Sequence, residues 1–77
     1  MNVKEITDKA ADWAAENVTG GTLMHHRTIL EQGAGWQYHG EASDKALLAV
    51  LRNKLTERGM YAEKTDGFGR VWYRSRG

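Results

Sequence analysis

Three histidines offer the widest choice of chemistry in this sequence, because a neutral imidazole can bind a metal ion and titrates near neutral pH. They are His25, His26 and His39, and the 77-residue chain contains no cysteine that could join them in a metal site. Two adjacent histidines on a helix point to different sides, so His25 and His26 cannot chelate one ion there as an i, i+4 pair does. We therefore expect neither a metal nor any other cofactor.

The sequence also contains no pattern typical of nucleophilic catalysis. Ser43 and Ser75 lack a nearby histidine that could act as a base. The glycines at 67 and 69 enclose too short a loop to cradle a phosphate ahead of a helix, and a strand pattern follows them. The sequence thus favours a protein that binds a partner and is not an enzyme.

The charged residues are divided unevenly along the chain. Residues 1–42 contain three Lys or Arg and six Asp or Glu, a net charge of −3, whereas residues 43–77 contain eight and four, a net charge of +4. An anionic partner responds to the local potential and not to the total charge, so we expect the second half to carry the binding surface. The candidate partner-binding residues are Lys45, Arg52, Asn53, Thr56, Tyr61, Lys64, Arg70, Trp72, Arg74 and Arg76.

Glycines mark the boundaries of the elements that must position these residues, because the chain contains no proline. Apolar residues at helical spacing predict a first helix over about residues 3–18, with Asn2 as its N-cap. A looser apolar stripe predicts a second helix over about residues 23–32, capped by Thr22 and ended by Gly33. The first half is therefore expected to be helical.

The segment around the second helix leaves alternatives open. A hairpin could replace this helix, with residues 27–32 turning through Gly33 and Gly35 into residues 36–39. The stretch 36–42 is too short for a helix. Its Trp36/Tyr38 alternation suits either a short third strand near 36–39 or an ordered loop that buries aromatic rings.

A third helix over residues 44–58 is the clearest element, with Ser43 expected as its cap and Gly59 as its end. At about 100° per residue, four leucines fall on one side of this helix and predict its buried stripe. They are Leu47, Leu48, Leu51 and Leu55. The opposite side is expected to be exposed and gathers Lys45, Ala49, Arg52, Asn53 and Thr56.

The last segment, residues 60–74, alternates in polarity across a glycine-rich loop at 66–69 and predicts a β-hairpin. The expected core face contains Met60, Ala62, Val71 and Tyr73. The expected outer face contains Tyr61, Glu63, Arg70, Trp72 and Arg74. A bulge at Gly69 would reverse half of this assignment. Trp72 is thus expected to be partly exposed, whereas Trp13 and Trp36 are expected to fill the core.

Together the elements predict one α+β domain over residues 1–77, in which three helices are followed by a C-terminal β-hairpin. The longest apolar run, residues 46–51, is far shorter than the roughly 18 residues of a membrane span. The N-terminal residues also lack the apolar stretch of a signal peptide. We therefore expect a cytoplasmic protein without a membrane partner.

A capped helix with leucines four apart, a glycine stop and a hairpin with a basic, glycine-rich tip resembles the second half of a winged helix-turn-helix domain. The resemblance is carried by Ser43, Leu47, Leu51, Leu55, residues 59–61 and residues 66–73, and covers about 35 of the 77 residues well. It implies that the helix enters the major groove of DNA and that the hairpin, the wing, touches phosphates or the minor groove. The connection over residues 33–42 departs from the family, because a helix-turn-helix joins its helices in about three or four residues.

Two functions follow from these patterns. The first is a small DNA-binding regulator of transcription, of a kind expected in a phage or another mobile element, that binds double-stranded DNA. Lys45, Arg52, Asn53 and Thr56 would then contact bases, while Lys64, Arg70, Arg74 and Arg76 would contact the backbone. The alternative is a phage-encoded inhibitor or adaptor that binds a host protein of a nucleic-acid machine, with Tyr61, Trp72 and the arginines as anchors.

Overall fold

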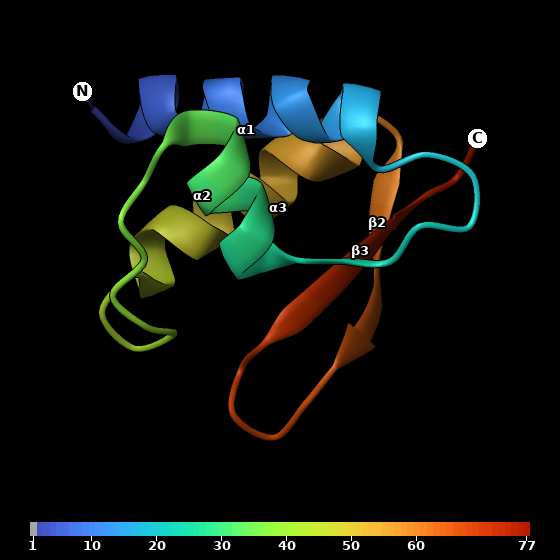
Figure 1. Ribbon diagram of the computed structural model, residues 1–77. Helices are drawn as coiled ribbons and strands as arrows, with labels where there is room; N and C mark the ends of the chain where they lie inside the picture. Colours follow the sequence, from blue (N-terminus) through green and yellow to red (C-terminus); the bar gives the residue numbers. More distant parts are fainter. Residues whose placement is uncertain (1) are drawn as a thin grey trace.

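The computed structural model describes residues 2–77, which form an α+β fold with three helices and a three-stranded antiparallel sheet (Figure 1). The elements are α1 (Val3–Asn17), β1 (Met24–His25), α2 (His26–Ala34), α3 (Lys45–Glu57), β2 (Met60–Thr65) and β3 (Val71–Ser75). The strands lie in the order β1-β3-β2. The expected class is therefore confirmed, but a short strand stands between the first two helices where none was expected.

Helix α1 begins as the sequence predicts, because the Asn2 side chain accepts a hydrogen bond from the Glu5 backbone N–H at 2.9 Å. The side of α1 that faces the core carries small side chains, including Ala10 and Ala14, both fully buried. Figure 1 shows α1 running across α2 and α3. Small residues on this side let α2 approach α1 closely.

The point of closest approach on α2 is Gly33, which was expected to end the helix. It lies inside α2, and a Cβ atom at this position would stand 2.8 Å from the Cα of Ala10 and 3.1 Å from the Cβ of Trp13. The helix ends instead at Gly35, which adopts the left-handed conformation with φ of 66°. Gly33 is therefore a packing residue, and Gly35 is the C-cap.

The predicted start of the second helix is wrong. Met24 and His25 are extended and pair with Tyr73 and Trp72 of β3, so the helix begins at His26. Thr22 is not its cap, because the His25 side chain takes that role and accepts a hydrogen bond from the Arg27 N–H. Pairing with β3 depends on residues almost fifty positions away, which local helical spacing does not reveal.

The structure also decides between the alternatives left open for residues 27–39. The hairpin over residues 27–39 does not form, since residues 26–34 are helical, and no strand forms near 36–39 within the described residues 2–77. The segment is an ordered loop in which Trp36 and Tyr38 are partly buried against the core. Trp13 is likewise partly buried there and does not fill the interior as expected.

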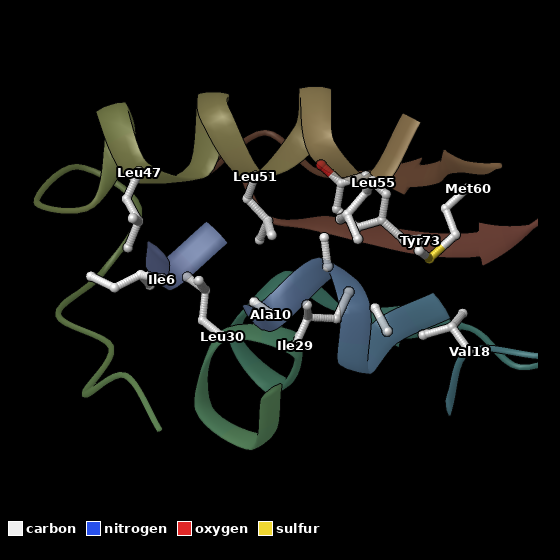
Figure 2. Packing of buried hydrophobic residues seen from close by; sticks show 12 residues of the cluster. Ile6, Ala10, Val18, Ile29, Leu30, Leu47, Leu51, Leu55, Met60 and Tyr73 are labelled. Carbon is white, nitrogen blue, oxygen red and sulfur yellow. The ribbon is translucent and has the colours of Figure 1, made fainter. Parts of the chain in front are cut away.

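Helix α3 keeps the predicted leucine stripe but not the predicted cap. Leu47, Leu51 and Leu55 point from α3 into the core, toward side chains of α1 and α2 (Figure 2), while Leu48 is only partly buried. Asp44, not Ser43, is the N-cap residue, and its side chain makes no cap bond. The carboxylate of buried Asp44 turns instead to the preceding loop, where it accepts hydrogen bonds from the His39 N–H at 2.7 Å and from Trp36 Nε1 at 3.4 Å.

Strands β2 and β3 form the expected hairpin with an irregularity at Glu63. Ala62 pairs with Tyr73, but Lys64 pairs with Trp72, so one extra residue bulges from β2. The predicted core face is confirmed: Met60 and Tyr73 are buried (Figure 2), and Ala62 and Val71 pack against the same cluster. On the outer face the bulge places Lys64, not Glu63, opposite Trp72.

No helix within the described part of the chain, residues 2–77, is long and apolar enough to span a membrane.

Asp8 on α1 should respond to acid because it joins two helices through ion pairs. Its carboxylate lies 2.9 Å from Lys4 Nζ and 3.0 Å from Lys54 Nζ of α3, and hydrogen bonds from these two groups lower the pKa of Asp8 to about 2. This pKa lies below the ordinary value of 3.8, so the stabilisation is complete above that value and is lost as the pH falls through about 2. We expect a carboxyl-carbon NMR titration of Asp8 to show this low midpoint. A midpoint at the ordinary value would contradict the linkage.

Candidate functional site

The side of α3 that faces away from the core presents the residues that the sequence singles out. Lys45, Arg52, Asn53 and Thr56 are all exposed, as predicted. The Thr56 hydroxyl donates a hydrogen bond to the Arg52 carbonyl at 2.9 Å, which fixes its orientation. Among residues 2–77 no carboxylate forms an ion pair with Lys45 or Arg52, so both charges are available to a partner.

The tip of the β2–β3 hairpin adjoins the beginning of this helix. Lys45 and Leu48 of α3 and Phe68 and Gly69 of the tip line a shallow groove of about 460 Å³. A Cβ atom at Gly69 would lie 3.8 Å from Glu41, which closes the same groove from the loop side. The beginning of α3 and the hairpin tip are therefore neighbours. We define the helix-and-tip surface as the exposed residues of these two elements, Lys45, Arg52, Asn53, Thr56, Phe68 and Arg70.

Phe68 is a member of this surface that sequence reasoning missed. It stands at the end of the hairpin with 77% of its surface exposed, the largest exposed fraction among the large apolar residues of the described chain. Its position between two glycines was visible in the sequence. Its exposure was not predicted, because apolar residues are usually buried. A ring held in this position can insert into or lie against a partner surface.

Asp66 fixes the shape of the hairpin tip. Its carboxylate accepts hydrogen bonds from the backbone N–H groups of Phe68 at 2.9 Å and Arg70 at 3.0 Å, and it forms an ion pair with the Arg70 guanidinium. The same guanidinium lies 5.2 Å from the centre of the Phe68 ring. The tip is thus ordered before any partner arrives, and the charge of Arg70 is partly neutralised.

The remaining candidates lie on the outer sheet face, which looks away from the helices. We define it as Tyr61, Lys64, Trp72, Arg74 and Arg76. Lys64 Nζ lies 4.8 Å from the Trp72 ring centre and the Arg76 guanidinium 4.8 Å from the Tyr61 ring centre. Arg74 stands 3.9 Å from Glu63, and its buried Nε has no hydrogen-bond partner within residues 2–77. The ten predicted residues therefore fall on two surfaces and not on one.

Trp72 is partly buried, and its environment predicts a modest role in stability. Its ring meets the His25 ring edge to face at 4.8 Å and lies beneath Lys64, whereas neighbouring Tyr73 is only 2% exposed and belongs to the core. We expect Trp72→Ala to lower the melting temperature by only a few degrees, because an aromatic pair of this kind contributes about 0.5 to 1.5 kcal/mol. Tyr73→Ala should cost about 3 to 5 kcal/mol. Equal losses in thermal melts would show that the two faces are wrongly assigned.

A polar cluster that the sequence did not predict lies beside the hairpin tip. His26 is 2% exposed, and its Nε2 lies 3.0 Å from the Tyr38 hydroxyl and 3.3 Å from Glu41 Oε1. Burial lowers the pKa of His26 and raises that of Tyr38, while the Tyr38 hydroxyl lowers the pKa of the Glu41 carboxyl. A neutral ring, a phenol and a carboxylate therefore meet at neutral pH. No periodicity connects these residues, because an irregular loop separates them.

Comparison with protein families, with curated proteins and with solved structures finds no significant match to this chain. The argument for function therefore depends on the surfaces described above.

Proposed function

We propose that the protein is a small DNA-binding regulator of the winged helix-turn-helix type. In this proposal α3 lies in the major groove and presents Lys45, Arg52 and Asn53 to the bases. The hairpin tip is the wing, and it contacts the adjacent backbone through Arg70. The order of elements, in which α3 leads directly into a hairpin that pairs with a short upstream strand, is compatible with such a fold.

The observation that carries the proposal is the contact between the hairpin tip and the start of α3. In the winged helix-turn-helix family that the chain resembles, a helix enters the major groove while the wing contacts the DNA beside it, so helix and wing must be neighbours on the protein. Here Lys45 and Phe68 line one groove, so the helix and the tip can approach the same segment of DNA.

The distribution of ion pairs supports the same surface. Arg27, Lys54 and Arg58 each pair with carboxylates of the protein. In contrast, Lys45 and Arg52 of the helix-and-tip surface form no ion pair within residues 2–77, whereas Arg70 of this surface pairs with Asp66. Unpaired cations can neutralise phosphates and release counterions without first breaking an internal bond.

The connection between α2 and α3 is longer than the family pattern, but hydrogen bonds and a helix cap order it. Asp44 accepts hydrogen bonds from the loop at Trp36 and His39, and the Gly35 C-cap ends α2. These bonds join the beginning of α3 to the loop that follows α2, although the connection exceeds the turn of an ordinary helix-turn-helix.

Binding to duplex DNA, measured by fluorescence anisotropy at several salt concentrations, tests the proposal. We expect Arg70→Ala to weaken binding to every sequence and to reduce the slope of log K against log salt by about one, whereas Asn53→Ala should relax sequence preference. Lys9→Ala is the matched control, because Lys9 is an exposed cation on α1 that forms no ion pair within residues 2–77, and its loss changes the total charge equally. No affinity for any duplex at low salt, or equal effects of Lys9→Ala and Arg70→Ala, would exclude this function.

A protein partner is the second candidate, and the outer sheet face favours it. This face places Tyr61 and Trp72 under cationic side chains, and aromatic residues with arginines are frequent anchors of protein interfaces. If this face binds a protein, Trp72→Ala should weaken that complex by roughly 2 kcal/mol or more while Arg52→Ala leaves it unchanged. The opposite pattern, measured by titration calorimetry with a purified partner, would move the interface to α3.

A further inference from the structure

The loop before α3 brings Glu41 against both histidines at the beginning of α2. One donor atom each from His25, His26 and Glu41 lie within 4.8 Å of one another. The shortest of these separations given by the structure joins His26 Nε2 to Glu41 Oε1 at 3.3 Å. Imidazole nitrogens and a carboxylate oxygen thus meet at one point.

The adjacent histidines can face one point because only His26 belongs to the helix. His25 is the N-cap residue, with extended backbone angles of φ −69° and ψ 141°. The two rings consequently meet edge to face, with centres 4.7 Å apart. Two adjacent histidines within one helix would point to different sides, but the extended backbone of His25 removes this restriction here.

We propose that His25, His26 and Glu41 form a binding site for a divalent transition-metal ion, Zn²⁺ in the first place. Two imidazoles and one carboxylate are a donor set that zinc accepts, whereas Mg²⁺ and Ca²⁺ prefer sites made of oxygen ligands. This proposal does not rest on the proposed DNA binding, although the two sites adjoin: Glu41 also lines the groove between α3 and the hairpin tip, and Arg70 lines the pocket beside His25.

One of the three donor separations matches a tetrahedral ion, and the other two are at most 4.8 Å. In a tetrahedral site with bonds of about 2.0 to 2.1 Å, neighbouring donor atoms are about 3.3 Å apart, which is the separation of His26 Nε2 and Glu41 Oε1. An adjoining pocket of about 410 Å³ is lined by His25, Tyr38, His39 and Glu41, among others. Its lining also includes the cations Arg27 and Arg70. The pocket opens beside His25 and Glu41 and leaves room for a fourth ligand such as water.

Binding changes several hydrogen bonds of the protein. His26 Nε2 would exchange its contacts with the Tyr38 hydroxyl and the Glu41 carboxylate for the ion. His25 Nδ1 accepts the Arg27 N–H at 2.9 Å, so in the neutral ring the hydrogen lies on Nε2. Ligation through Nε2 requires the other tautomer and gives up this bond. The ion would therefore replace a local cap by a link between α2 and the loop that carries Glu41.

Titration calorimetry and thermal melting of tag-free protein with ZnCl₂ test the site, with MgCl₂ as the comparison ion. We expect saturable binding of one Zn²⁺ per chain and a melting temperature that rises with Zn²⁺ concentration, but no such rise with MgCl₂. Glu41→Gln keeps the shape of the side chain and removes the charged ligand, and it should weaken Zn²⁺ binding by at least about tenfold. His25→Ala should also weaken it.

His39→Ala is the matched control, because this exposed imidazole lines the same pocket but is not one of the three ligands. It should leave Zn²⁺ affinity unchanged. Equal weakening by His39→Ala and Glu41→Gln would show unspecific binding to surface histidines and would overturn the proposal. Absence of a one-to-one isotherm at 100 µM Zn²⁺, a concentration on the order of the weakest useful affinity, would overturn it as well.

Discussion

Replacing Leu51 by alanine should lower the free energy of unfolding by about 2 to 5 kcal/mol. Leu51 is fully buried in the middle of α3, and its side chain points toward α1 and α2 (Figure 2). The substitution removes buried methyl groups and leaves a cavity among residues that cannot fully collapse around it. A domain of this size has a total stability on the order of 5 kcal/mol, so this variant should be largely unfolded near physiological temperature.

Lys45→Ala is the control on the same helix, because Lys45 is exposed and forms no ion pair within residues 2–77. It should change the unfolding free energy by less than about 0.5 kcal/mol. Urea denaturation followed by circular dichroism measures both variants. Similar midpoints for the two would mean that α3 is rotated about its axis relative to the arrangement described here.

Gly33→Ala should be almost as damaging, although it adds only a methyl group. In a helix interior alanine is favoured over glycine by about 1 kcal/mol, so propensity alone predicts a more stable protein. The added Cβ would lie 2.8 Å from the Ala10 Cα atom, and two backbones cannot yield as a flexible side chain can. We expect α1 and α2 to separate and the net loss to reach about 2 kcal/mol or more.

Gly21→Ala provides the comparison for this variant. A Cβ atom at Gly21 meets no other atom within 4 Å. The substitution should therefore be neutral or slightly stabilising, by up to about 1 kcal/mol, through the unfolded chain. If Gly33→Ala raised the melting temperature as Gly21→Ala does, the close approach of the two helices would be refuted.

The sequence predicted those parts of the fold whose signal is local. Helix α1 and its Asn2 cap, the leucine side of α3 and the core face of the hairpin follow from spacing and capping alone. Strand β1 could not be predicted in this way, because its two residues become a strand only through pairing with β3. The predicted cap of α3 was wrong for a related reason. The Asp44 side chain binds a loop whose position cannot be predicted from neighbouring residues in the sequence.

The candidate site was predictable to a similar extent. The exposed side of α3 follows from helical periodicity, so Lys45, Arg52 and Asn53 could be chosen correctly as exposed residues. Whether the outer sheet face adjoins these residues of α3 depends on how the hairpin packs. The spacing of residues in a single sequence does not reveal this packing. The cluster of His26 with Glu41 could not be predicted from the sequence at all, because it depends on the path of an irregular loop.

The bulge at Glu63 also bears on self-association of the folded protein. With the strands in the order β1-β3-β2, strand β2 leaves one row of backbone groups without a partner strand, and such a row can template pairing with a second copy of a chain. The extra residue interrupts this row midway, next to the charged side chains of Glu63 and Lys64. On the opposite side β1 is only two residues long. Neither border of the sheet can therefore support a long regular ladder, which protects the exposed hairpin against edge-to-edge aggregation.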